Sequence, residues 1–231
     1  LTREILAEVL GERTLRHDRA GEEHYNVTSA FIKSMRGSDP DASLYWLARM
    51  LEAGEDPRFI LRRMAIFAAE DVGNADPQAL AVVTAAFSSF EFVGLPEGWI
   101  PMAQAAVYLA AAPKSKASYR GYLAAREAVQ TRGSLPVPLH LRNAPTGLMR
   151  SLGYGAGYAD PHAEPEGIGT QRYLPEGVAG PFYVPAARGY EREIAAHLER
   201  IRSARASAKE DAAGAETRAA PSPPRARGAG A

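Results

Sequence analysis

The sequence predicts an all-α fold, a bundle of amphipathic helices, on three observations. First, three Asp-Pro pairs, at Asp39, Asp56 and Asp76, each precede an apolar stretch. An Asp before a helix accepts hydrogen bonds from free backbone N–H groups, and Pro fits the first helical turn. Second, a glycine follows each stretch, as is common where helices end. Third, the large apolar residues within the stretches recur at helical spacing.

The same signals give the expected elements in order. An early helix contains Val27, Ala30, Phe31 and Met35. Helices then follow each Asp-Pro pair and end near Gly54, Gly73 and Gly94. Later helices are expected over residues 101–111, 116–131, 146–152 and 189–202, with Pro101 in a first turn and Ser115 as a cap. The residues predicted to face inward include Leu80, Val83, Phe87, Phe90, Val107, Tyr108 and Ala111.

Two stretches lack helical periodicity. Residues 153–185 are rich in Gly and Pro with scattered aromatics, which favours a long loop packed on the helices. Residues 203–231 hold no large apolar side chain, so we expect a disordered, mildly basic Ala/Pro/Arg tail. We therefore expect an end of a preceding helical segment over 1–38, a principal domain over 39–202, and the tail.

Composition excludes several classes of protein. The formal net charge of the 231 residues is zero, so it gives no argument for nucleic acid or membrane. The chain has no cysteine, which excludes disulfides and thiolate metal sites and fits a reducing, cytoplasmic setting. The longest apolar run, Ala103 to Ala112, is well short of the ~20 residues that span a bilayer. The chain begins with Leu1 inside a helical pattern, so we expect a fragment of a longer protein.

No motif predicts catalysis in this chain. The nearest match to a phosphate-binding loop, Ala111 to Ser115, has no glycine, and Pro113 has no N–H to offer a phosphate. The glycines that begin at Gly153 lack the strand–turn–helix context of such a loop. Glu70, Asp71 and Asp76 are close in sequence, but helix capping explains them better than a metal does. We therefore predict no catalytic, cofactor or metal residues. The five histidines, which lack metal-ligand spacing, are His17, His24, His140, His162 and His197.

Two groups of surface residues are candidates for contacts with partners. A solvated face is the default explanation of the basic residues, and a surface that neutralises DNA phosphates is the alternative. The candidate phosphate contacts are Arg62, Arg63, Lys114, Lys116 and Arg142. Aromatic residues beside the apolar stripes are candidate interface anchors, with packing in the core as the alternative. These aromatics are Tyr45, Trp46 and Trp99.

Several of these stretches together resemble the replication-associated recombination protein A family, whose eukaryotic relatives are the Werner helicase-interacting proteins. The resemblance covers nearly all of residues 1–200. Lys116 departs from it, because an Asn commonly follows Pro-Lys-Ser in the family, and so does Pro101, which stands where relatives favour helix formers. The stretches are HYN from His24, SAFIKSMRGSDPDA from Ser29, LYWLARMLEAGEDP from Leu44, AEDVGNADPQAL from Ala69, VYLAAAPKSKA from Val107 and VPLHLRNAPTGLMRSLGYG from Val137.

The resemblance implies a AAA+ ATPase related to clamp loaders that acts at stalled replication forks. Its ATPase motifs, with ATP and Mg, would lie in an N-terminal module that this chain lacks, so no catalytic residue carries over. Residues from about Asp39 to Arg202 would form a tetramerisation domain that resembles a clamp-loader collar.

We accordingly predict a helical scaffold that assembles a homotetramer around DNA at replication forks, associated with the nucleoid. Two alternatives remain. One is a module that grips DNA directly, and the other is a docking platform for single-stranded-DNA-binding protein or a helicase.

Overall fold

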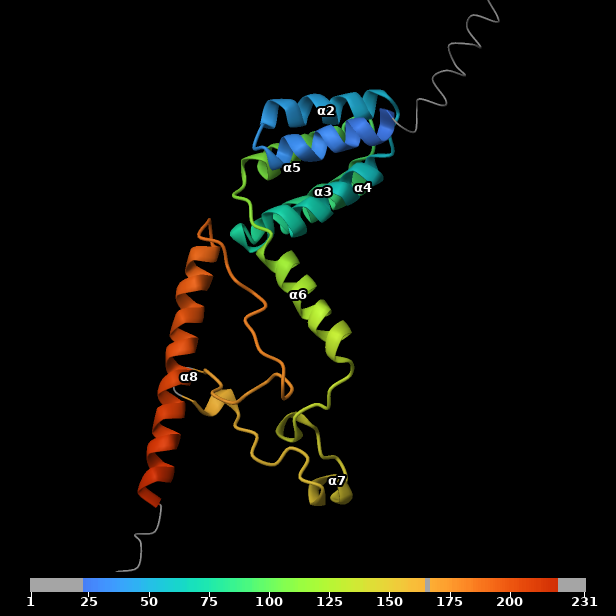
Figure 1. The fold of residues 1–231 in the computed structure, drawn as a ribbon. Helices are drawn as coiled ribbons and strands as arrows, with labels where there is room; N and C mark the ends of the chain where they lie inside the picture. The colour runs from blue at the N-terminus through green and yellow to red at the C-terminus, as the bar shows by residue number, and fades with distance from the viewer. Residues whose placement is uncertain (1–22, 165–166, 220–231) are drawn as a thin grey trace, which may run out of the picture. The chain divides into compact units, whose positions relative to one another are not determined.

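The computed structural model describes residues 23–164 and 167–219, and these are helices joined by turns and loops, without strands. They divide into two compact units (Figure 1). The first holds the described residues up to Ala125 together with Phe182–Arg192, and the second holds Arg126–Pro181 and the residues from Glu193 onward. The helix over 23–36 thus lies in the same unit as the helices that follow Asp39, although a domain boundary is predicted at residue 38.

The Asp-Pro pairs begin helices as predicted. Asp39 caps α2 (Pro40–Glu52), where its carboxylate accepts a hydrogen bond from the Ala42 N–H at 2.9 Å. Asp56 caps α3 (Pro57–Phe67) in the same way through Arg58. Asp76 precedes α4 (Gln78–Val93) and accepts from the Gln78 N–H at 3.0 Å. Each carboxylate satisfies a backbone donor that the helix itself leaves free.

Helix α3 does not end at a simple cap. It continues into a π-helical turn, Ala68–Val72, and a 3-10 turn, Gly73–Ala75, before α4 begins. Gly73 has a φ of 53°, as a chain reversal at this point requires. Glu70 and Asp71 lie within this π-helical turn.

The remaining helices largely match the expected ranges. Helix α5 (Trp99–Ala111) starts two residues before Pro101, which lies in its first turn as predicted. Helix α6 (Ala117–Arg132) begins where Ser115 Oγ accepts from the Ala117 N–H at 3.1 Å. Thr146 caps the short α7 (Gly147–Ser151).

Helix α8 (Glu191–Ala219) continues past Arg202, the residue at which the last helix is predicted to end. The structure therefore has helix over 203–219 where composition predicts a disordered tail. Ala, Arg, Lys and Glu dominate this stretch, and they have high intrinsic helix propensity even without an apolar face. The rest of the predicted tail, 220–231, and the predicted helix near residues 2–10 lie outside the described residues.

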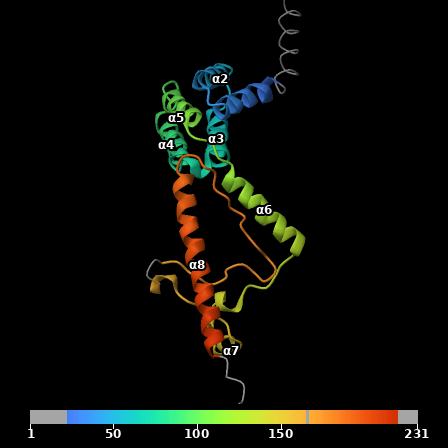
Figure 2. The same cartoon turned by 60° about the vertical axis from the view of Figure 1, so that its left-hand side comes forward.

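The core of the first unit forms where the helix over 23–36 and α2 to α5 meet. Phe31, Ile60, Met64 and Phe67 are at most 1 % exposed. Helix α4 packs beside α5, and α5 packs against α2 (Figure 2). Beside larger residues such as Val83, Met102 and Leu109, helices α4 and α5 bury five alanines. These are Ala79, Ala86, Ala105, Ala106 and Ala110.

The inward faces predicted for α4 and α5 are partly wrong. Leu80, Phe87 and Val107 were expected in the core, but they are 47 %, 39 % and 38 % exposed, and Ala111 is exposed too. Both helices are apolar around most of their circumference, so periodicity does not select a face. Val83 and Phe90 are buried as predicted, at 1 % and 9 % exposed, whereas Leu80, Phe87 and Val107 turn to the surface.

A matched pair on α3 tests this core. Ile60→Ala removes a side chain with 0 % exposure, and we expect it to lower the free energy of unfolding by about 2–5 kcal/mol. Ile66→Ala removes the same atoms from a site that is 48 % exposed and should cost about 1 kcal/mol or less. Urea titrations followed by circular dichroism measure both. Equal losses would contradict the assigned faces of α3.

Candidate functional site

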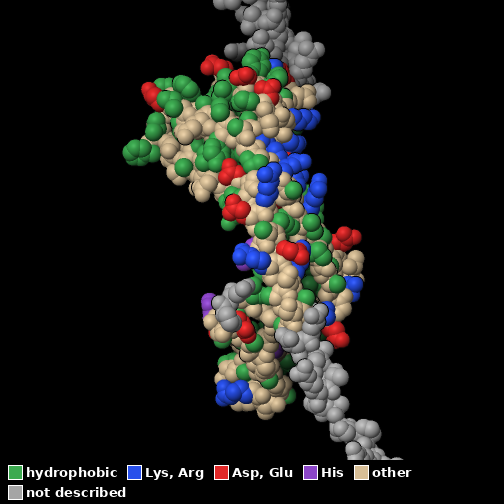
Figure 3. Space-filling model, turned by 90° about the vertical axis from the view of Figure 1, so that its left-hand side faces the viewer, with side chains coloured by type: hydrophobic (Ala, Val, Ile, Leu, Met, Phe, Trp, Pro, Cys, Tyr) green, Lys and Arg blue, Asp and Glu red, His purple; other side chains and the backbone are tan. Residues whose placement is uncertain are grey.

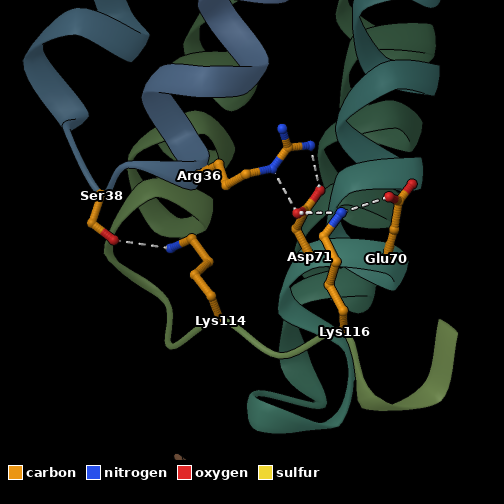
Figure 4. A network of polar contacts seen from close by, with 6 residues as sticks. All are labelled: Arg36, Ser38, Glu70, Asp71, Lys114 and Lys116. Carbon is orange, nitrogen blue, oxygen red and sulfur yellow. Dashed lines mark hydrogen bonds and ion pairs between the residues drawn. The ribbon is translucent and has the colours of Figure 1, made fainter. Parts of the chain in front are cut away.

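Residues of three separate stretches meet around the carboxylate of Asp71 (Figure 4). Arg36, at the end of the first described helix, donates from Nε to Oδ1 at 2.7 Å and from Nη2 to Oδ2 at 3.0 Å. Lys116, in the segment before α6, lies 3.2 Å from Oδ1 and donates to Glu70 Oε1 at 2.8 Å. The side chain of Asp71 is only 4 % exposed, so these partners replace the water that it loses.

The charges of this cluster hold one another in the ionised state. Burial raises the pKa of Asp71, but hydrogen bonds and charges from Arg36 and Lys116 outweigh it, and the pKa lies below its ordinary value. The hydrogen bond to Glu70 is the main cause that raises the pKa of Lys116. The cluster is therefore a structural junction, with its charges compensated internally.

The side chain of Lys114 turns back toward the C-terminal end of α5. Its Nζ donates to the carbonyl oxygens of Ala110, at 2.9 Å, and Ala112, and it lies 3.4 Å from Ser38 Oγ. Burial is the main cause that lowers the pKa of this lysine. With its donors occupied and a helix rather than a strand before it, the segment from Ala111 to Ser115 does not fit nucleotide phosphates.

A second junction in the same unit is built on the fully buried Glu191. Its carboxylate accepts from Ser115 Oγ at 2.7 Å, from the Tyr183 hydroxyl at 3.0 Å and from the Ala186 N–H at 2.6 Å. Gly189, with a φ of 50°, passes so close to Ala75 that a Cβ would collide with its carbonyl oxygen. The segment 182–192 is thus fastened to the helices of the first unit by neutral donors. No sequence motif marks Glu191.

The structure does not bring the five predicted phosphate contacts together. Arg62 is exposed on α3, with a long 3.9 Å pair to Asp56. Arg63 is half-buried, and its Nε has no hydrogen-bond partner among the described residues. Lys116 belongs to the Asp71 cluster, and Lys114 donates to backbone carbonyls. Arg142 lies in the second unit.

Two of the three predicted interface aromatics are exposed. Tyr45 is 61 % and Trp99 is 51 % exposed, whereas Trp46 packs partly against the core and stacks edge-on with Tyr45 at 5.0 Å. Sequence reasoning missed other exposed apolar residues, which gather on α4, α5 and the turn between them. These are Leu80, Phe87, Phe92, Val93, Leu95, Ile100 and Val107.

We call this set together with Trp99 the apolar surface. Figure 3 shows hydrophobic side chains gathered on the exposed part of the helical first unit. Phe92 is 91 % exposed, which is exceptional for a large aromatic side chain. Beside the apolar surface, a groove of about 670 Å³ is lined by Leu47 and Leu51 of α2 and by Trp99. Glu52 and Glu55 add acidic groups to its lining.

The described part of the chain holds no group of three His, Cys, Asp or Glu side chains that could bind a metal ion. None of its helices is both long and apolar enough to cross a bilayer.

Asp71→Asn tests the junction. The neutral amide of Asn has no negative charge to pair with Arg36 and Lys116. Because both cations are partly exposed, we expect the free energy of unfolding to fall by only about 1–3 kcal/mol at neutral pH. The folded-state pKa is depressed, so wild-type stability from this group is complete well above 3.8 and disappears as pH falls below that value. Urea titrations across this range should show a flatter pH profile for the variant. The exposed Asp41→Asn serves as control, and an identical profile for both variants would contradict the role of Asp71.

The chain was compared with known proteins. Residues 37–202 match the family described as MgsA AAA+ ATPase C terminal, and residues 1–36 match the AAA C-terminal domain. Replication-associated recombination protein A of Coxiella burnetii is 49% identical over 200 residues, 86% of this chain and 46% of that protein. The same-named protein of Haemophilus influenzae is 47% identical over 204 residues, 87% of this chain and 46% of that protein.

A eukaryotic relative matches as well. ATPase WRNIP1 of Dictyostelium discoideum is 45% identical over 177 residues, 76% of this chain and 20% of that protein. The chain thus spans less than half the length of each of these relatives. With more than half of its residues matched, the chain belongs to the family of MgsA AAA+ ATPase C-terminal domains, as the motifs around Ser29, Ala69 and Val137 predict.

Proposed function

We propose that this chain is the oligomerisation part of a AAA+ ATPase of replication-fork maintenance, recombination and repair. Four copies would join through their helical units and hold four ATPase modules around DNA, in the cytoplasm and at the nucleoid. ATP and Mg would bind in those N-terminal modules, outside this chain. The names of the relatives and the family match support the setting.

The observation that carries the scaffold role is the apolar surface on α4 and α5. Large apolar side chains that lie together in water are costly, and a soluble monomer rarely keeps a large contiguous patch of them. Aromatic anchors such as Phe92 and Trp99 are typical of the energetic centre of an interface. Burial of this surface against further copies removes that cost.

A scaffold of this kind controls hydrolysis by position. Phosphoryl transfer in such ATPases is commonly completed by an arginine from a neighbouring subunit, which stabilises the charge of the transition state. A domain that fixes the order and spacing of subunits therefore sets activity without touching nucleotide.

Light scattering on this chain should report a mass near that of four copies. Phe92→Asp places a charge on a side chain that is 91 % exposed, and we expect it to shift the mass to smaller species while the circular dichroism spectrum stays unchanged. Leu148→Asp on α7, 70 % exposed in the second unit, should leave the mass unaltered. A wild-type chain that is monomeric at all concentrations would refute the scaffold.

A second candidate is a docking module for another protein, such as single-stranded-DNA-binding protein or a helicase. The groove lined by Leu47, Leu51 and Trp99 favours it, because its acidic lining suits a basic and apolar partner segment. Specific capture of such a segment by a monomeric chain would favour this role over the scaffold.

Direct DNA binding through the first unit is a weaker candidate. Lys116 is already paired with carboxylates, and Lys114 with backbone carbonyls. Arg62 is the exposed cation that remains of that predicted set in this unit. Strongly salt-dependent DNA binding that Arg62→Gln abolishes would favour this role.

We expect no ATP affinity above that of an unrelated helical protein. Lys114, the lysine of the phosphate-loop-like stretch, is bound to two backbone carbonyls and has no glycine-rich loop beside it. Isothermal titration with Mg–ATP measures this, with Lys114→Ala as the comparison. Binding that this substitution removes would contradict the assignment of ATP to another module.

A further inference from the structure

A cationic cleft lies in the second unit, apart from the apolar surface. Its volume is about 410 Å³, and it forms in the segment between α6 and α8. Sequence reasoning singled out Arg142 alone in this region, and the structure adds other polar side chains around it. The residues used below are Val137, His140, Arg142, Arg172 and Glu176.

Arg142 is held in place without losing its charge. Its Nε donates to the Val137 carbonyl at 2.7 Å, and its guanidinium lies 4.9 Å from the centre of the Tyr154 ring. A backbone carbonyl and an aromatic face orient the group but carry no formal negative charge. The hydrogen bonds found within the described residues occupy neither Nη atom of Arg142.

Arg172 is held in a similar way, by carbonyl oxygens of residues that follow it in the chain. It donates from Nε to the Leu174 carbonyl at 3.2 Å, and from Nη2 to the Pro175 and Val178 carbonyls at 2.9 Å and 2.8 Å. Among the described residues, the ion pairs include neither this arginine nor Arg142. Two positive charges therefore line one cleft without a protein counter-ion in contact.

His140 also lines the cleft. Its Nε2 lies 2.9 Å from the Arg172 carbonyl oxygen. Because a carbonyl oxygen only accepts, Nε2 carries the hydrogen, so Nδ1 of the neutral ring is an acceptor and the donors to a phosphate come from the arginines. Glu176 is the one acidic residue in the lining, so the two arginines outweigh it.

From this geometry we infer that the cleft binds a phosphate group. Arg142 can offer both Nη atoms to phosphate oxygens as paired hydrogen bonds, and Arg172, whose Nε and Nη2 donate to carbonyls, can offer Nη1. The orientation of both guanidinium groups is set before a ligand arrives. A phosphate offers more oxygens than a carboxylate does, which suits donors that come from two arginines. The volume also leaves room for the sugar or base attached to that phosphate.

The phosphate can belong to a nucleic-acid strand or be free in solution. Neither Tyr158 nor Tyr173 lines the cleft, and the Arg205 guanidinium already lies 5.8 Å from the centre of the Tyr173 ring, so the geometry alone does not choose between the two sources. The inference does not depend on the scaffold, because the cleft lies wholly within the second unit. A monomeric chain with an intact cleft would separate the two.

The test uses the whole chain and a fluorescein-labelled oligothymidylate, with binding followed by anisotropy at several salt concentrations. Arg142→Gln should weaken binding about 10-fold, because one charged hydrogen-bonding group is lost. Glu176→Gln should strengthen binding severalfold, because the repelling carboxylate is removed. This second variant removes no hydrogen bond found in the described residues, so it tests the cleft even if Arg142→Gln disturbs the loop.

The matched control is Arg150→Gln on α7, which removes the same charge from the same unit outside the cleft. It should change binding by about twofold or less. Equal weakening by Arg142→Gln and Arg150→Gln, with no gain from Glu176→Gln, would show a diffuse cationic surface and overturn the inference.

A second arm distinguishes the sources of the phosphate. Binding of inorganic phosphate in calorimetry, without binding of the oligothymidylate, would assign a site for a free phosphate. Tight oligothymidylate binding with weak competition would assign a strand. Absence of binding by both probes overturns the inference.

Discussion

The buried carboxylate of Asp71 is the constraint on which the first unit depends. A charge taken out of water is tolerated only when it is paired and hydrogen-bonded, and here Arg36 and Lys116 supply both. The partners come from the end of the first described helix and from the segment that leads into α6. One side chain therefore fixes how three stretches, distant in sequence, converge. From there Ser115 extends the order to Glu191 and the segment 182–192.

The way in which α4 and α5 pack determines what the surface can do. Their buried faces combine Ala79, Ala86 and Ala105 with larger side chains such as Met102 and Leu109. Both helices are apolar beyond the buried face, so other large residues are left in solvent, with Phe92 the clearest example. Intramolecular stability and an unsatisfied apolar exterior thus have the same cause. That link is the basis on which we propose that the unit self-associates.

Local chemistry made much of this fold predictable, and long-range contacts made the rest unpredictable. Asp39, Asp56 and Pro101 mark helix starts because capping depends on a few adjacent residues. Nothing near Arg36 in sequence announces Asp71, 35 residues away, or relates His140 to Arg172. The inward face of α4 was mispredicted at Leu80 and Phe87 because a helix that is apolar all round has no preferred side. Composition likewise missed the extension of α8 to Ala219, since helix propensity acts without a core.

The cationic side chains that the two units use differ in what they contact. Lys116 meets carboxylates, so its charge is consumed in holding the first unit together. Arg142 and Arg172 meet backbone carbonyls, which orient a guanidinium but leave its charge uncompensated. The first unit also carries the apolar surface that we propose to bind further copies, while the second holds two arginines that no carboxylate of the described residues contacts. Hydrophobic contact is non-directional and phosphate recognition is directional, so the two proposed contacts depend on different physical interactions.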